Sequence, residues 1–324
     1  NTGIRINNGL IREDHNVLTI SDRDIISYTK SITDPYGKKY LNKLLKNTIN
    51  NFKPDLIVLG HADRIDIDTL SEAKNKFPNL KICQWFLDPL SKSGPDYLKN
   101  KERLSHKSNI CDATFITTSP DVIDFKIKNS FFIPNPCDKS LDYLENFREN
   151  KIYDVFYAIS HGVHRGKLRY GKKDEREKFI IKLKQISNEV KFDLYGMFGR
   201  EPIWGDEFLT NLSNSNMGIN LSRGKPTKYY SSDRLAQLMG NGLLTLIHKD
   251  TKYGNFFDNN EMIFYKDIYD LSEKILKYKK DKKTALKIAR NGHIKYHKFF
   301  NSSKVSSFMV DRTYGKNSKF YWDS

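Results

Sequence analysis

Apolar runs of four to eight residues alternate with amphipathic segments along most of this 324-residue chain. Parallel strands need long crossover connections, usually helices, so this alternation predicts parallel sheets covered by helices. Strands are expected where apolar runs are bounded by turn residues, at 16–20, 55–60, 81–87, 113–118, 130–135, 153–160, 191–196, 217–222, 243–247 and 262–265. Helices are expected among and after them, at 36–52, 67–76, 174–187, 268–278 and 284–299. We therefore expect an α/β fold made of doubly wound sheets.

The chain is longer than a single hydrophobic core usually supports, which predicts two domains. Residues 133–154 contain two prolines and a charged run and interrupt the alternation, so we expect a linker there. The expected domains are Rossmann-like and cover 1–140 and 151–300, and a helical tail at 301–324 is expected to pack back on the N-terminal domain. A doubly wound domain normally opens with a strand, so its first strand is expected upstream of Asn1.

Positive charge is concentrated in the second half of the chain. Residues 1–150 hold 22 Lys and Arg against 20 Asp and Glu (+2), whereas residues 151–324 hold 33 against 19 (+14). Such a field suits phosphate groups, nucleic acid or an anionic membrane surface, although solvated helix faces in a lysine-rich chain would give the same count. One lysine run is especially dense, with Lys277, Lys279, Lys280, Lys282 and Lys283.

Cysteine usage and hydropathy exclude two other classes. Cys83, Cys111 and Cys137 are widely spaced and form no CxxC pair, which argues against a disulfide framework or a zinc site and favours a reducing compartment. No stretch approaches the roughly 20 apolar residues of a membrane span. We expect a cytoplasmic protein that is soluble or at most bound to a membrane surface.

Ligands of open parallel sheets bind at the carboxyl ends of strands, so the residues that follow each strand are the first candidates. A loop rich in glycine, imidazole and fixed positive charge follows the expected strand 153–160. Freed backbone N–H groups beside such cations suit a diphosphate, and the alternative is a basic surface loop. The candidates in this loop are His161, Gly162, His164, Arg165 and Lys167.

Two further strand ends carry weaker signals. Tyr195 and Gly196 close the expected strand 191–196 and predict a cradle for a flat base, although an ordinary turn with core aromatics would look the same. Arg223 and Lys225 follow the strand at 217–222 and place cations around a glycine.

The stretch Lys228–Ile247 reads as a short helix that runs into a buried strand. Ser231, Ser232 and Asp233 are the residue types that cap a helix N-terminus, and Tyr230 precedes them. The exposed N–H groups of such a terminus attract anions, and Arg234 adds a full positive charge. The alternative is that the serines and the aspartate act only as caps.

Several segments resemble glycosyltransferases of the group 1 type, in particular the branch related to spore maturation proteins. The resemblance rests on YYSSDRLAQLMGNGLLTLIHKDTKYGNFFDNNEMIFYKDIYDLSEKI, ALKIARNGHIKYHKFF, IPNPCD and NTGIRINNGLIREDHNVLTISDRD, and it covers nearly the whole chain apart from 301–324. It implies the GT-B architecture, in which two Rossmann-like domains face a cleft. The 1–140 domain would then lie on the acceptor side and the 151–300 domain would hold a nucleotide sugar.

The resemblance also implies roles for two residues of the short helix. Arg234 would contact the donor diphosphate, and Gln237 would stand where the family's donor-binding glutamate sits. Many members carry two glutamates eight positions apart, whereas this chain has Tyr229 and Gln237 there. An amide cannot accept two ribose hydroxyl hydrogen bonds as a carboxylate does, so the choice of nucleotide stays open.

Folds of this type stabilise the leaving diphosphate with cations and helix termini, so the resemblance implies a metal-independent transferase that uses a UDP- or GDP-sugar. No Asp-x-Asp stands at a strand end as a metal site. An inverting reaction would need a base, and His61, Asp63 and Asp88 follow first-domain strands; a retaining one would not. His61 as a helix cap and Asp88-Pro89 as a turn are the alternatives.

Acceptors consistent with the resemblance and the basic half are a hydroxyl of a glycan or of a lipid-linked glycan at the inner face of the membrane. A sugar-nucleotide epimerase or a fucosyl-type transferase on the same fold is an alternative. So is a protein that binds nucleic acid or an anionic surface, although no recognised nucleic-acid motif appears and no specific nucleic acid is expected.

Overall fold

The computed structural model describes residues 2–94, 96–160 and 175–323. The chain divides into two compact units. The N-terminal unit comprises Ile6–Lys92, Asp96–Ile133 and Ser303–Ser324, and the C-terminal unit is mainly Pro134–Ser302, joined by the residues up to Arg5. No helix among the described residues is both long and apolar enough to cross a membrane.

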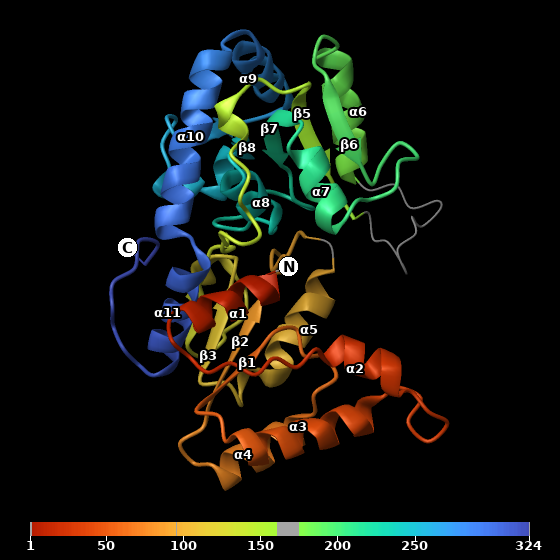
Figure 1. The fold of residues 1–324 in the computed structure, drawn as a ribbon, viewed down its shortest axis with the longest axis vertical. Coiled ribbons are helices and arrows are strands. Elements are labelled where there is room, and N and C mark those ends of the chain that lie inside the picture. The colour runs from red at the N-terminus through yellow and green to blue at the C-terminus, as the bar shows by residue number, and fades with distance from the viewer. Residues whose placement is uncertain (1, 95, 161–174, 324) are drawn as a thin grey trace. The chain divides into compact units, whose positions relative to one another are not determined.

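The N-terminal unit contains a four-stranded parallel sheet in the order β1-β2-β3-β4 (Figure 1). Its strands are β1 (Leu56–Leu59), β2 (Lys81–Phe86), β3 (Ala113–Ile116) and β4 (Ser130–Phe132). The helices whose residues lie in this unit, wholly or in part, are α1 (Thr2–Arg12), α2 (Asp22–Thr29), α3 (Lys38–Phe52), α4 (Ile67–Lys76), α5 (Tyr97–Ser108) and α11 (Ser302–Thr313).

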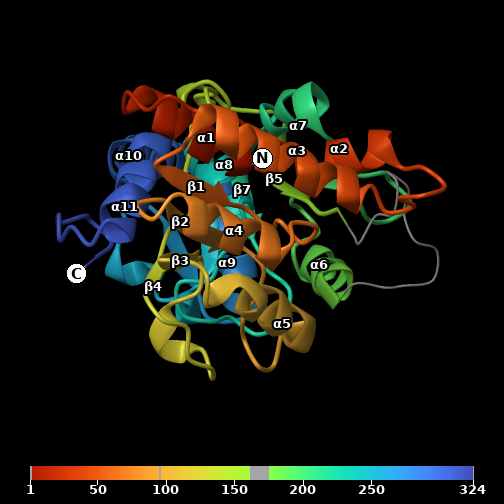
Figure 2. The ribbon, with the colours of Figure 1, turned by 90° about the horizontal axis from the view of Figure 1, so that it is seen from below.

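Helices cover this sheet because each carries an apolar stripe. Leu41, Leu45 and Ile49 recur at a spacing of four on α3, and they join Leu70 of α4 and Ile82 of β2 in one core cluster. Helices α3 and α4 pack against each other (Figure 2).

Aromatic contacts hold helix α11 against the sheet of the same unit. The Phe308 ring of α11 meets Phe115 of β3 and Phe131 of β4 edge to face, with centroids 6.0 and 6.1 Å apart.

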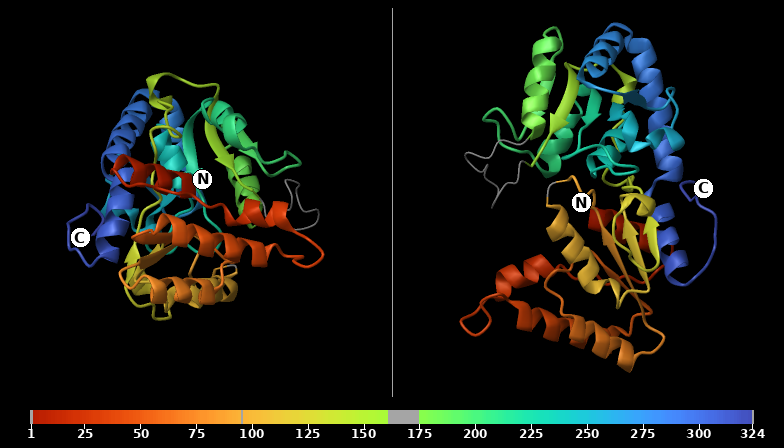
Figure 3. Two further views of the ribbon diagram at one scale, coloured as in Figure 1. Left: turned by 60° about the horizontal axis from the view of Figure 1, so that its bottom comes forward. Right: turned by 180° about the vertical axis from the view of Figure 1, so that it is seen from behind.

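The C-terminal unit contains a five-stranded parallel sheet in the order β6-β5-β7-β8-β9. Its strands are β5 (Tyr153–Ala158), β6 (Phe192–Tyr195), β7 (Ser215–Asn220), β8 (Leu244–His248) and β9 (Ile263–Tyr265). Its helices are α6 (Glu175–Ile186), α7 (Gly205–Leu212), α8 (Arg234–Gly240), α9 (Ile268–Lys280) and α10 (Lys282–Phe299). Helix α10 runs alongside β8 (Figure 3).

Alternation along β5 separates the two faces of this sheet. Val155 and Tyr157 belong to the cluster that α6, α9 and α10 cover, and Phe156 belongs to the cluster that α7 and α8 cover. Both faces of the sheet are thus buried, which explains why most residues of its strands are apolar.

Nine of the ten expected strands and all the expected helices are present, and the strand at 16–20 is the exception. Residues 15–21 form no strand, and Leu18 is about half exposed at 49%. The β-branched residues of this run favour an extended backbone, but no neighbouring strand pairs with it.

The expected linker at 133–154 is buried in part, at residues 133–138, 142 and 146. Asp142 is 1% exposed and accepts hydrogen bonds from Arg5 Nε at 2.9 Å and Nη2 at 2.6 Å. Burial alone would lower the pKa of Arg5, but the Asp142 carboxylate outweighs it and raises this pKa. Asn146, also 1% exposed, donates to the carbonyl groups of Leu212 and Ser215 at 2.8 Å each. Asp142 and Asn146 are therefore internal partners rather than solvated linker residues.

Gly242 makes the turn from α8 into β8. Its φ is +74°, in the left-handed region, and a Cβ built there would lie 2.6 Å from Cδ1 of Phe147. Gly199 has the same backbone conformation, with φ of +75°, but a Cβ there would meet no atom within 4 Å. The two positions therefore separate backbone strain from steric overlap.

We predict that Gly242→Ala lowers the free energy of unfolding by about 2 to 4 kcal/mol, because left-handed strain and overpacking against Phe147 add together. Gly199→Ala should cost only about 1 kcal/mol, from the backbone alone. Urea denaturation followed by circular dichroism measures both changes. Equal losses for the two variants would show that the Phe147 contact relaxes freely.

Candidate active site

The strand order of the C-terminal unit places a topological switch point between β5 and β7. The chain leaves β5 toward β6 on one side and later returns to β7 on the other, so the connections diverge at this point. Such a divergence opens a crevice outside the carboxyl ends of the two strands, where doubly wound folds bind ligands. Ala158 and Leu221 are the residues that mark this end of β5 and β7.

The guanidinium group of Arg234 lies at the switch point. Its Nε and Nη2 atoms donate to the carbonyl oxygen of Ala158 at 3.2 and 3.0 Å. Its Nη1 atom donates to the carbonyl of Leu221 and to Oγ of Ser232, each at 3.1 Å. The guanidinium carbon lies 4.8 Å from the centroid of the Tyr157 ring. These bonds use four of the five N–H donors of Arg234 and leave one for another acceptor.

Arg234 is a buried cation, and the groups that it contacts at the switch point are all neutral. The residue is 8% exposed, and no carboxylate among the described residues forms an ion pair with it. Burial of an unpaired charge is costly, and an anion that bound at the switch point would offset that cost. The electrostatics of the switch point therefore favour an anionic ligand.

Two other polar atoms at the end of β7 also have no hydrogen-bond partner among the described residues. They are Oδ1 of Asn220 and Oγ of Ser222, and both are buried. Buried polar atoms of native proteins are usually paired, so these two are available to a ligand or to water at the same strand end.

The end of β6 requires a glycine for steric reasons. Gly196 has φ of +73°, and a Cβ there would lie 1.8 Å from the carbonyl oxygen of Ile159. The preceding Tyr195 is 7% exposed, packs on Phe156 and donates its hydroxyl to Asn211 at 2.6 Å. The Tyr195 ring is thus part of the core, whereas the Gly196 backbone lies at the strand end.

The expected capping of α8 is not observed. Asp233 is the N-cap residue, but its side chain makes no capping hydrogen bond. Ser231 is fully buried, and its hydroxyl contacts the Asn135 amide at 3.1 Å and the Tyr253 hydroxyl at 3.0 Å. The hydroxyl of Ser232 accepts from Arg234. These side chains bind neighbouring side chains at the start of the helix and do not form capping hydrogen bonds with its first N–H groups.

The remaining candidates of the C-terminal unit differ in exposure. Arg223 and Lys225 are exposed after β7, and Tyr230 is buried. Gln237 is half-buried on α8, and no described residue is recorded as a partner of its side-chain amide. The candidates of the basic loop, His161, Gly162, His164, Arg165 and Lys167, lie outside the described residues.

In the N-terminal unit, the three expected catalytic residues lie together at the ends of β1 and β2. His61 Nε2 is 3.9 Å from Oδ2 of Asp88. Arg103 of α5 joins the acidic residues, because its Nε and Nη2 atoms bind both oxygens of Asp63, at 3.1 and 2.6 Å. Its Nη1 atom reaches Oδ2 of Asp88 at 3.3 Å. We call these four residues the His61 cluster.

The surroundings of the His61 cluster set the charge of its members. The His61 ring lies edge-on to Phe86 with centroids 5.2 Å apart, and its Nδ1 atom is buried without a described partner. Burial lowers the pKa of His61, and the charge of Arg103 adds to this against the opposing effect of Asp88. Burial alone would raise the pKa of Asp63, but the hydrogen bonds and the charge of Arg103, with smaller contributions from neighbouring cations, together outweigh burial and lower this pKa.

A neutral imidazole beside a carboxylate can accept a proton near neutral pH. Asp63 is instead held as an ion pair and is suited to positioning Arg103. Sequence reasoning missed Arg103, because an arginine in the charged helix 97–108 carries no local signal that distinguishes it from its solvated neighbours.

We predict that Arg103→Met raises the pKa of His61, because the substitution removes a cation and releases the carboxylates of Asp63 and Asp88 beside the ring. NMR titration of the imidazole signals of the whole protein measures the shift. Lys99→Met removes the same charge from an exposed position of the same helix and should leave the His61 pKa unchanged. An unchanged or lower pKa in Arg103→Met would contradict the proposed electrostatics.

Comparisons with known proteins agree with this architecture. Residues 173–311 match the family model described as "Glycosyl transferase-like". The structure is similar to that of TarM, which is known from S. aureus, with 12% sequence identity, 84% of this chain and 58% of the TarM chain covered, and a TM-score of 0.55. It is also similar to an alpha-glucosyltransferase in complex with UDP and a 13-mer DNA containing a HMU base, with 13% identity, 97% and 95% of the two chains covered, and a TM-score of 0.59.

A curated protein, the bifunctional pantoate ligase/cytidylate kinase of Prochlorococcus marinus, is 24% identical over 202 residues. That match covers 59% of this chain and 38% of the relative, so the chain spans well under half the length of that protein. This chain contains no G-x-x-x-x-G-K-(S/T) segment, the phosphate loop found in many nucleotide kinases. The parallel sheets and the structural neighbours together show that the chain has the fold of the GT-B glycosyltransferases, and the family model that matches residues 173–311 covers less than half of the chain.

Proposed function

We propose that this protein transfers a sugar from a nucleotide-diphosphate sugar to a hydroxyl group of a glycan or a lipid-linked glycan. The observation that carries the proposal is Arg234, a buried cation with neutral partners at the switch point of a glycosyltransferase fold. Sugar transfer leaves negative charge on the departing diphosphate, and fixed positive charge stabilises that leaving group. A buried cation needs no reorganisation to do so, because the protein already holds it in place.

The donor would lie over the ends of β5, β6 and β7. Its diphosphate would accept a hydrogen bond from the remaining N–H group of Arg234. Arg223 and Lys225 would be further cations at the end of β7. The basic loop candidates from His161 to Lys167 would add to this set. Gln237 would face the ribose, since its side-chain amide makes no hydrogen bond to a described residue. UDP is the first nucleotide to test, because the alpha-glucosyltransferase neighbour binds it, and GDP is the second.

The His61 cluster would act on the acceptor. Asp88, or His61 beside it, would accept the proton of the attacking hydroxyl if the reaction inverts the anomeric carbon. Asp63 would act through Arg103 by holding the guanidinium group toward Asp88. In a retaining reaction the same groups would orient the acceptor hydroxyl without taking its proton.

We place the enzyme in the cytoplasm, at the inner face of the membrane. A reducing compartment would keep the thiols of Cys83, Cys111 and Cys137 free. The basic charge of the C-terminal unit would favour an anionic surface or an anionic lipid-linked acceptor.

Arg234→Ala should weaken UDP binding by about 2 kcal/mol or more, through loss of a charge-assisted contact to the diphosphate. Isothermal titration calorimetry with UDP measures the loss, and Arg290→Ala, which removes an exposed arginine of α10, is the matched control. Because Ala158 and Leu221 would lose their donor, Arg234→Lys provides a second variant that keeps the charge and should bind UDP with intermediate affinity. Unchanged UDP affinity in a folded Arg234→Ala protein would remove Arg234 from the donor site.

Transfer should also persist in the presence of a chelator, because protein cations rather than a metal ion stabilise the leaving group. Release of UDP from a UDP-sugar is the measurement, before and after dialysis against EDTA. Loss of activity that added Mg²⁺ or Mn²⁺ restores would show that the donor needs a metal.

A further inference from the structure

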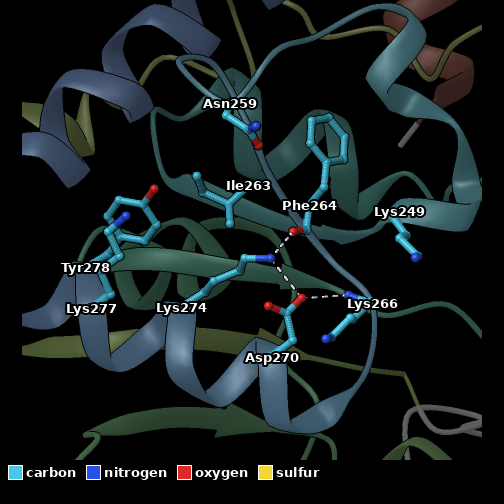
Figure 4. Close-up of a pocket in the computed structure, with 9 residues that line it drawn as sticks. All are labelled: Lys249, Asn259, Ile263, Phe264, Lys266, Asp270, Lys274, Lys277 and Tyr278. Atoms are coloured by element: carbon cyan, nitrogen blue, oxygen red, sulfur yellow. Dashed lines mark hydrogen bonds and ion pairs between the residues drawn. The ribbon is translucent and has the colours of Figure 1, made fainter.

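A recess along the outer strand of the C-terminal sheet is separate from the residues assigned to the donor. Its volume is about 540 Å³, and it lies between β9 and α9 (Figure 4). Within the described part of the chain, strand β9 pairs with β8 alone and is therefore an edge strand. Four lysines, Lys249, Lys266, Lys274 and Lys277, line the recess, against one acidic residue, Asp270. We call it the lysine groove.

One of the four lysines is committed to the protein. Lys274 Nζ donates to Oδ2 of Asp270 at 2.8 Å and to the carbonyl oxygen of Phe264 at 2.6 Å. The same Asp270 oxygen accepts from the backbone N–H of Lys266 at 2.8 Å. Oδ2 of the single carboxylate of the groove therefore holds two protein donors, and the charge of Asp270 is offset by Lys274.

The other three lysines keep their charge for a ligand. Lys249, Lys266 and Lys277 are exposed, and none forms an ion pair with a described residue. Figure 4 shows Lys277 at one side of the groove and Lys249 and Lys266 at the other, with Lys274 between them. Three unpaired ammonium groups around one recess produce a local positive field that an extended polyanion would match at several points.

The backbone of β9 argues against a peptide as the occupant. A peptide strand that extended the sheet would need the outward carbonyl groups of the edge strand. The Lys274 ammonium group already occupies the carbonyl of Phe264, which is one way in which proteins protect an edge from strand addition. The occupant must therefore bind through side chains.

Three apolar or aromatic residues, Ile263, Phe264 and Tyr278, line the groove between its charges, together with the polar Asn259. Ile263 is buried, Phe264 is half-buried and the Tyr278 ring lies beside Lys277, whose Nζ is 5.2 Å from its centroid. Apolar and aromatic faces pack against the C–H faces of sugar rings, whereas ammonium groups bind phosphates. The combination fits a molecule that carries both groups.

We propose that the lysine groove binds a glycan that carries phosphate groups, and that this glycan is the charged part of the acceptor, which rests on the transferase function proposed above. The groove recruits the acceptor through its phosphates, at a place apart from the donor crevice. A flat anionic bilayer fits this site less well, because the charges and the apolar floor lie in a recess rather than on a protruding face.

The test compares two triple variants of the full chain. Lys249→Gln/Lys266→Gln/Lys277→Gln removes the free charges of the groove, and Lys283→Gln/Lys287→Gln/Lys298→Gln removes three exposed charges of α10 as the matched control. Calorimetry with phosphorylated dextran should show at least tenfold weaker binding for the groove variant and less than a twofold change for the control. Unphosphorylated dextran should bind at least tenfold more weakly than phosphorylated dextran to the unmodified protein.

Two further probes separate the possible failures. Equal losses in both triple variants would overturn the proposal, because the attraction would then come from overall charge. If the groove variant lost its binding to vesicles of phosphatidylcholine and phosphatidylglycerol but still bound phosphorylated dextran, the proposal would be overturned in favour of a membrane. UDP affinity should be the same in all three proteins; a groove effect in a protein that binds neither UDP nor GDP would support the groove while refuting the transferase function.

Discussion

The hydrogen bonds of Arg234 to the carbonyl groups of Ala158 and Leu221 link the ends of β5 and β7, the two strands from which the chain connections diverge. Strand carbonyls at a diverging edge have no ladder partner, and a guanidinium group can satisfy several of them at once because its donors form a rigid fork. The same side chain thereby leaves a positive charge at the proposed donor site. Structural support and the proposed anion binding would thus depend on one residue, and a lysine could supply the charge but not the geometry.

The position of Arg234 depends in turn on how both ends of α8 are fixed. At the C-terminal end, Asn241 accepts from the backbone of Leu144 at 3.0 Å and donates to Asp142 at 3.3 Å. Asp142 is held by the bidentate bonds from Arg5. A helix of only seven residues has little intrinsic stability, so this buried polar framework, rather than helix propensity, sets where α8 lies.

The sequence was informative wherever burial alone decides the structure. The apolar runs of β5 and β8 could only be covered strands, and Gly242 and Gly196 stand where a left-handed turn demands them. Prediction failed wherever the structure of a residue depends on a partner that is distant in the sequence. Residues 16–20 have strand propensity but no neighbour to pair with, and Asp142 reads as a solvated charge unless Arg5 is known to meet it. Ser231 is a residue type that commonly caps helices, yet its hydroxyl forms hydrogen bonds with Asn135 and Tyr253, which are distant in the sequence.

The uneven charge of the chain has two physical forms within the C-terminal unit. Arg234 is buried among neutral groups, where the low dielectric strengthens its attraction to an anion and salt screens it little. Lys249, Lys266 and Lys277 are exposed, so their attraction is weaker for each charge and falls as ionic strength rises. A buried cation suits a compact ligand that must be held rigidly during a reaction. Several exposed cations around a recess suit a long polyanion that must attach and slide, so the two kinds of charge fit the two substrates of a sugar transferase.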